Sequence, residues 1–221
     1  MNNVSIKTRL VMSKLGAAKY ISHLDFMRTA RRAFIRAGIP LRYSEGFNPH
    51  PLMSFALPLS VGQESVCELL DFESAGEMPP DALKRLASAL PEGITATEMY
   101  SGGQKPGLLR WLEVSGRLYY DGGVPAGAIE ALEAALAAEH IFISLKTKRG
   151  EAETDIAPML RGAAFSDAGH GVIAIRAVIS AQNPTLNPNA LAAAAASAGY
   201  APDFAEWRRV GVYDDDMKIF R

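Results

Sequence analysis

The densest group of side chains that could do chemistry lies in the first quarter of the sequence. His23 and His50 could each act as a general acid or base, and they are the candidate catalytic residues. A lone histidine at a helix start or in a loop is more often a hydrogen-bonded structural residue, which is the alternative for both. The spacing of the histidines and the nearby carboxylates matches no compact metal motif. We therefore predict no metal ion and no cofactor.

A basic stretch follows the first histidine. Its arginines are Arg28, Arg31, Arg32 and Arg36. On a helix these side chains fall within one sector of about 140°. Such a stripe can bind phosphates, helped by backbone donors near Ser22 and His23 at the helix start, or it can be a solvated face. Asp25 is explained most simply as a capping partner of Ser22 and an ion-pair partner of Arg28.

A loop with two aromatic residues comes next. Tyr43 and Phe47 could stack on a nucleic-acid base or a cofactor ring, or they could anchor the loop.

In the second half, Arg208 and Arg209 are neighbours in a predicted strand, so only one of them can reach a given face. The complete set of candidate binding residues is Ser22, His23, Asp25, Arg28, Arg32, Arg36, Tyr43, Glu45, Phe47, Asn48, His50 and Arg209.

Composition and charge set limits on function. The 221 residues are 48% hydrophobic and 21% charged, which is ordinary for a globular protein, and the formal net charge is −1. Residues 1–50 hold nine Lys or Arg against two Asp or Glu, so any anion-binding surface should lie in the first quarter.

The one cysteine, Cys67, excludes an internal disulfide and an all-cysteine metal site, and its apolar neighbours predict a small core residue.

The location of the protein is predicted from its apolar runs. None of them is long enough to span a bilayer, and the first residues alternate instead of forming a signal peptide. We therefore expect a cytoplasmic protein without membrane contact.

The hydrophobic pattern predicts six elements in the first half of the chain. Alternation indicates strands at about 4–12, 52–58, 65–72 and 94–100, and helical spacing indicates helices at about 24–37 and 80–90. The first helix is expected to bury Leu24, Met27, Ala30, Phe34 and Ala37. This β-α-β-β-α-β order is ferredoxin-like.

The same order resumes after a Gly- and Pro-containing break at 101–107. Strands are expected at about 112–120, 141–145, 171–180 and 206–213, and helices at 125–138 and 188–198. Segment 149–169 fits least well and is either an insertion or a long hairpin. The sequence therefore predicts an α+β fold of two tandem ferredoxin-like modules with antiparallel sheets, which cover residues 1–101 and 108–221.

Three segments, Tyr20–Arg28, Tyr43–Pro51 and Ser54–Leu59, resemble the signature of a known family. This family is the radical-SAM-linked domain of unknown function, which is found alone or fused behind a cobalamin-binding radical S-adenosylmethionine protein. Two positions depart from the family pattern. Leu52 stands where members usually have lysine, and Asn187 stands where an arginine is expected.

The resemblance implies partnership with a radical S-adenosylmethionine protein and a link to RNA maturation or the ribosome. Cys67 alone cannot supply the three cysteine ligands of a radical S-adenosylmethionine cluster, so this chain is not itself such an enzyme. Three hypotheses remain: a non-catalytic accessory protein that binds RNA or an RNA-borne substrate, a scaffold whose arginines dock an acidic protein, and a metal-independent RNA-processing enzyme that uses His23 or His50. The sequence favours the first.

Overall fold

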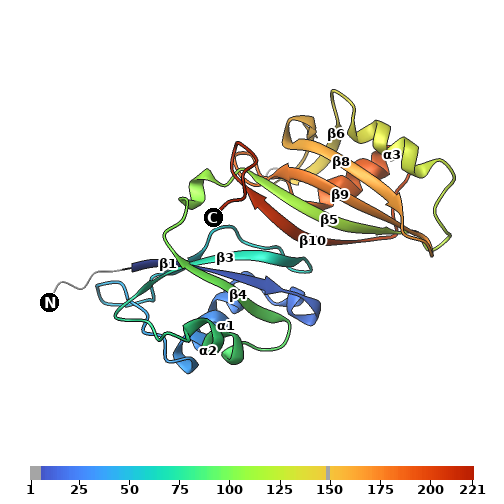
Figure 1. Ribbon diagram of the computed structural model, residues 1–221. Helices are drawn as coiled ribbons and strands as arrows, with labels where there is room; N and C mark the ends of the chain where they lie inside the picture. Colours follow the sequence, from blue (N-terminus) through green and yellow to red (C-terminus); the bar gives the residue numbers. More distant parts are fainter. Residues whose placement is uncertain (1–5, 148–149) are drawn as a thin grey trace. The chain divides into compact units, whose positions relative to one another are not determined.

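The computed structural model describes residues 6–147 and 150–221 (Figure 1). Contacts divide the chain into two compact units. The first unit extends to Pro106 and includes Arg221, and the second runs from Gly107 to Phe220. Residues 4 and 5 of the first predicted strand, and residue 149 of the uncertain segment, lie outside the described residues.

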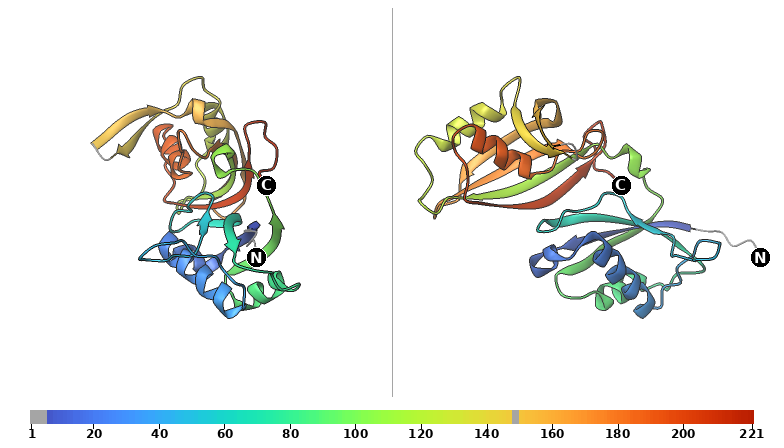
Figure 2. Two further views of the ribbon diagram at one scale, coloured as in Figure 1. Left: turned by 90° about the vertical axis from the view of Figure 1, so that its left-hand side faces the viewer. Right: turned by 180° about the vertical axis from the view of Figure 1, so that it is seen from behind.

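The first unit has the predicted order of helices and strands. It contains β1 (Ile6–Lys14), the 3-10 helix η1 (Gly16–Tyr20), α1 (His23–Arg36), β2 (Met53–Phe55), β3 (Glu64–Ser74), α2 (Ala82–Ala89) and β4 (Ile94–Ser101). The strands pair antiparallel in the order β4-β1-β3-β2. Figures 1 and 2 show α1 and α2 together on one face of this sheet. This is the ferredoxin-like arrangement.

Strand alternation divides the first sheet into an apolar face and a polar face. Leu10 of β1 and Phe72 of β3 point toward the helices and are buried with Phe26 and Phe34 of α1. Each such side chain stabilises the fold by about 1.5–3 kcal/mol through the apolar surface that it removes from water. Because side chains alternate along a strand, Arg9 lies on the opposite face of β1 from Leu10.

Lys14, at the end of β1, supports the segment that leads into α1. Its ammonium group donates to the carbonyl of Ile21 at 3.0 Å and lies 5.6 Å from the centre of the Phe26 ring. The side chain is fully buried, and this burial lowers the pKa of Lys14 although the nearby Glu68 opposes the shift. A buried lysine at this place helps to fix where the helix begins.

Cys67 lies in β3 and is half-buried, so it is not the core residue that its apolar neighbours predicted. Alternation in β3 buries Glu68 and Leu70, and the backbone N–H of Cys67 donates to the Ser65 hydroxyl at 3.2 Å.

The second unit has the same sheet order with one addition. It contains the end of the 3-10 helix η2 (Pro106–Leu108), β5 (Trp111–Tyr119), α3 (Ala128–Leu136), β6 (Phe142–Thr147), β7 (Gly150–Asp155), the 3-10 helix η3 (Ala157–Met159), β8 (Leu160–Asp167), β9 (Val172–Ser180), α4 (Asn189–Ser197) and β10 (Phe204–Tyr213). Its sheet runs β10-β5-β9-β8 and is antiparallel throughout. Gly116 of β5 is required by close packing, because a side chain there would meet the Trp207 ring.

The added element corrects the prediction for residues 141–145. These residues do form a strand, but in the described parts of the chain β6 pairs with β7 in a separate two-stranded hairpin (Figure 2). The strand that completes the main sheet beside β9 is β8, within the segment that fitted the pattern least well. The insertion is therefore the hairpin. The sequence pattern misassigned it because β6 has strand alternation of its own, whereas β8 is mostly exposed and has a weak apolar pattern.

The predicted α+β class with antiparallel sheets is confirmed. Among the described helices, none is long and apolar enough to cross a membrane.

Candidate functional site

The start of α1 is held by a capping interaction. The Ser22 hydroxyl accepts a hydrogen bond from the Asp25 backbone N–H at 3.1 Å and donates to the Asp25 carboxylate at 2.8 Å. Arg28 donates to the other carboxylate oxygen at 3.0 Å. The hydrogen bond from Ser22, followed by that from Arg28, lowers the pKa of Asp25. The predicted roles of Ser22 and Asp25 in capping, and the pairing with Arg28, are confirmed.

The four arginines of α1 are all exposed, but they differ in what they contact. Arg36 donates to the carbonyl of Ala89 at the end of α2, at 2.6 Å, and so has a structural partner in the first unit. The Arg31 guanidinium lies 5.7 Å from the centre of the Tyr43 ring. Within the described residues, the Arg32 guanidinium makes no hydrogen bond or ion pair. The part of the stripe that is available to a ligand is therefore centred on Arg28, Arg31 and Arg32.

Two apolar side chains share the outer face of α1 with these arginines. Leu24 is 65% exposed and Ile35 is 61% exposed. On a helix the two positions are separated by about 20°, and both lie close to Arg31 in angle. The prediction that Leu24 belongs to the buried stripe is wrong, because the buried stripe is centred on Phe26, Ala30, Ala33 and Phe34.

The loop after α1 is braced at its base and exposed at its tip. Tyr43 and Pro51 form an isolated antiparallel bridge, and the Ser44 backbone N–H donates to the His50 carbonyl at 2.8 Å. The Ser44 hydroxyl also lies 2.9 Å from Nδ1 of His50. Beyond this base the side chains are exposed, and Phe47 is fully so, at 106%. Other exposed residues of the tip are Glu45 and Asn48. The loop therefore presents an aromatic ring to solvent.

The two histidines have local structural contacts. The His23 ring is half-buried and meets the Phe55 ring edge-on, with 5.8 Å between centroids. His50 contacts Ser44 as described above. Across residues 6–147 and 150–221, neither ring bonds a carboxylate, and no three His, Cys, Asp or Glu side chains gather to hold a metal ion.

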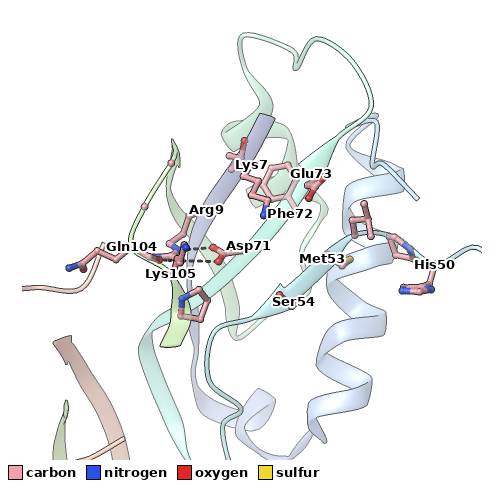
Figure 3. A pocket seen from close by; sticks show the side chains of 16 residues that line it. Lys7, Arg9, His50, Met53, Ser54, Asp71, Phe72, Glu73, Gln104 and Lys105 are labelled. Carbon is pink, nitrogen blue, oxygen red and sulfur yellow. Dashed lines mark hydrogen bonds and ion pairs between the residues drawn. The ribbon is translucent and has the colours of Figure 1, made fainter. Parts of the chain in front are cut away.

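A pocket of about 510 Å³ opens on the first unit, and sequence reasoning missed it (Figure 3). Its floor includes Arg9 of β1 and Asp71 of β3, which face each other in register. The two side chains form a double hydrogen bond at 2.6 and 2.8 Å, and Arg9 is only 2% exposed. Figure 3 shows His50 on one side of this pair and Gln104 on the other. The wall residues at the two sides come from segments 50–54 and 102–106.

One side of this pocket could be predicted from the sequence. Lys7 and Arg9 occupy the polar positions of an alternating strand, so a charged sheet face could be expected. Their partners on β3 are far away in sequence, and Asp71 is separated from Arg9 by 62 positions. The alternation alone therefore could not identify the pocket.

The candidate binding residue of the second unit, Arg209, lies inside a strand, and Asp155 is a further polar residue there with a structural role. Arg209 of β10 is buried and Arg208 is exposed, as expected for neighbours in a strand. Asp155 accepts hydrogen bonds from His140 and from the backbone N–H of Ile141 and of Ala157, an arrangement that closes the β6–β7 hairpin. The His140 contact, followed by that from Ile141, lowers the pKa of Asp155.

Comparison with known proteins identifies one family. A model described as "Uncharacterized protein conserved in bacteria (DUF2344)" matches residues 7–188. The match begins in β1 and ends directly before α4, so it includes α1, the 43–51 loop and the strands of the pocket. No curated protein matches the chain.

Solved structures that resemble this chain include two from complexes that contain Cbf5 and Nop10. The first is from the crystal structure of a Cbf5-Nop10-Gar1 complex, with a TM-score of 0.53, 10% identity, and coverage of 93% of this chain and 48% of that one. The second is from the crystal structure of an archaeal box H/ACA sRNP Nop10-Cbf5 complex, with a TM-score of 0.46, 11% identity, and coverage of 91% and 46%. This chain thus spans about half the length of each. At such identity, the first resemblance concerns the fold alone.

Proposed function

This chain belongs to the bacterial family described as uncharacterized proteins (DUF2344), and we propose that it binds RNA, or a substrate carried on RNA, as an accessory protein of a radical S-adenosylmethionine enzyme. The partnership rests on the resemblance of residues 19–62 to the radical-SAM-linked domain. A single cysteine cannot hold the cluster of such an enzyme, so the chain would act beside it. Binding of RNA rests on the chemistry of the first unit.

The observation that carries the proposal is the exposure of Phe47 on a braced loop. A fully exposed ring on a braced loop leaves both of its faces open to a stacking partner. Bases of single-stranded RNA stack on such rings, and each base contributes about 1–3 kcal/mol of binding energy. Tyr43 at the base of the same loop contacts Arg31, so the ring surface continues into the arginine face of α1.

The arginine face supplies the second part of RNA recognition. Arg28 lies one turn before Arg31 and Arg32 in α1, and all three side chains are exposed. Guanidinium groups bind phosphate oxygens through paired hydrogen bonds, and they also stack on bases. Arg28 is held by Asp25 with both groups exposed, and such a pair exchanges readily with a phosphate because exposed ion pairs are weak.

A second candidate function is protein docking, and one observation favours it. Leu24 and Ile35 are exposed between the same arginines, and Tyr20 is exposed just before the helix. RNA gains little from aliphatic side chains, whereas a protein partner with acidic and apolar residues would match this face. In that case the arginine face would dock the partner enzyme, and RNA would have no part in binding there.

The test is binding of a fluorescent single-stranded RNA oligonucleotide to the full chain, measured by anisotropy at low salt. The variants are Phe47→Ala, Arg31→Glu with Arg32→Glu, and Leu24→Ser with Ile35→Ser. We expect the first to weaken binding by about fivefold or more, because one stacked base is lost. The double arginine variant should lose most binding through lost phosphate contacts, and the aliphatic variant should change little.

Arg85→Glu is the matched control, because Arg85 is an exposed arginine of α2 with an ion-pair partner, Asp81. It should bind RNA like the parent chain. If the control loses as much affinity as the α1 variant, binding depends on net charge alone and the proposed surface is wrong. If RNA fails to bind while the aliphatic and arginine variants both lose a radical S-adenosylmethionine partner in a pull-down, docking replaces RNA binding as the function.

A further inference from the structure

The pocket beside the Arg9–Asp71 pair has an excess of positive charge. Its two carboxylates are already bonded to arginines, Asp71 to Arg9 and Glu73 to Arg42, the latter at 3.1 Å. Two further cations, Lys7 and Lys105, line the pocket. Both side chains are exposed, and within the described residues neither ammonium group makes a hydrogen bond or ion pair. The lysine charges are therefore available to an anion.

The two lysines are brought to one pocket by the end of the first unit. The backbone N–H of Gly102 donates to the carbonyl of Lys7 at 3.1 Å, so the chain that leaves β4 runs beside β1. Gln104 accepts from Arg9 through its backbone carbonyl at 2.9 Å, which fixes this segment to the buried ion pair. Lys105 follows directly, and the lysines thus enter the pocket from a strand and from an anchored segment.

The size and walls of the pocket indicate what kind of anion fits. A volume of about 510 Å³ exceeds that of an inorganic phosphate and lies within the range of small-molecule sites. Pro51, Met53 and Pro106 add apolar surface, and Ser54 adds a hydroxyl. Two ammonium groups match a dianionic phosphate monoester better than a carboxylate, which carries one charge. A phosphate with an organic body satisfies both the charge and the volume.

We propose that this pocket binds a phosphate monoester of nucleotide size, with the phosphate between Lys7 and Lys105 and the organic part toward Pro51 and Met53. The ligand can be a free nucleoside monophosphate or the 5′-phosphorylated end of an RNA. This proposal goes beyond RNA binding by α1 and does not depend on it, because the pocket is formed by β1, β2, β3 and two flanking segments.

The experiment is isothermal titration of the full chain with adenosine 5′-monophosphate and cytidine 5′-monophosphate, beside adenosine and inorganic phosphate. We expect the monophosphates to bind, and adenosine to bind at least about tenfold more weakly, because a charge-assisted contact is missing. Lys7→Gln and Lys105→Gln should each weaken monophosphate binding by about tenfold. Lys218→Gln is the control, because Lys218 is an exposed lysine of the second unit that pairs with Asp216, and it should bind normally.

Two RNA oligonucleotides, one with a 5′-phosphate and one with a 5′-hydroxyl, distinguish an RNA end from a free nucleotide as the ligand. Preference for the phosphorylated oligonucleotide that is lost in Lys7→Gln identifies an RNA end, and equal binding of the two with intact monophosphate binding identifies a free nucleotide. The proposal is overturned if neither monophosphate binds at millimolar concentration, or if binding is unchanged in both lysine variants. The Arg31→Glu, Arg32→Glu chain should retain monophosphate binding even where it loses RNA.

Discussion

The ion pair of Arg9 and Asp71 joins β1 to β3 on the polar face of the first sheet. Arg9 is 2% exposed and Asp71 is 29% exposed, and their two hydrogen bonds join neighbouring strands. A buried guanidinium without its carboxylate partner is costly, because the remaining charge has lost both its water and its counter-ion. The pair therefore matters more to stability than the exposed ion pairs of this chain.

Replacing the carboxylate tests this role. Asp71→Asn keeps the size of the side chain and removes its charge, and we expect the free energy of unfolding to fall by about 2–3 kcal/mol. Urea denaturation of the full chain measures the change. Asp81→Asn, which breaks the half-exposed pair with Arg85, is the control and should stay close to the parent. Equal effects of the two substitutions would contradict a special role for the buried pair.

Residue roles were predictable where the partners are close in sequence. Ser22, Asp25 and Arg28 lie within seven positions, and the capping pattern predicted their contacts. The hydrogen bond of Arg36 was not predicted, because the Ala89 carbonyl that accepts it is 53 positions away. The exposure of Phe47 was also beyond prediction, since an aromatic residue in a loop can either anchor it or project from it.

Helix α1 is the element that positions the proposed RNA surface, and its start is fixed by Ser22. The hydroxyl satisfies the backbone N–H of Asp25, which has no partner within the helix. We expect Ser22→Ala to lower the free energy of unfolding by about 1 kcal/mol and Ser22→Asp to lower it less, because aspartate can also cap. Thermal unfolding of the full chain measures both, and equal losses would contradict capping as the cause.

The acid dependence of this variant supplies an independent readout. The pKa of Asp25 is lowered in the folded chain, so its ionised form favours folding above its unfolded pKa, and that contribution is lost as the pH falls through the lowered value. The Ser22 hydroxyl is the first cause of the shift. The stability difference between parent and Ser22→Ala should therefore shrink on acidification. A difference that is constant with pH would show that the hydroxyl does not act on the carboxylate.

The elements were predicted best where the apolar period is strong. The order of strands and helices in the first unit follows from alternation in β1 and helical spacing in α1. Leu24 was wrongly assigned to the buried face of α1. The helix begins at His23, and Phe26 takes the buried position near its start. The β6–β7 hairpin was misassigned because the period of the apolar pattern identifies a strand but does not identify its pairing partner.

At the scale of the whole molecule, charge is unevenly distributed along the chain. Residues 1–50 carry an excess of seven positive charges, and the remaining residues carry an excess of eight negative charges. Nucleic-acid binding to such a chain should be local to the first unit, because the net charge of −1 gives no general attraction. Composition could predict this asymmetry, but it could not say whether the partner is RNA or an acidic protein.

The most direct test of RNA binding is its salt dependence in the parent chain and in an Arg28→Gln, Arg31→Gln, Arg32→Gln chain. For single-stranded RNA, the logarithm of the binding constant should fall with the logarithm of salt concentration by about 0.7 per phosphate contact. We predict a steep slope for the parent and a slope reduced by about 2 in the triple variant. Parallel slopes, or no binding to the parent chain at low salt, would contradict RNA recognition by α1.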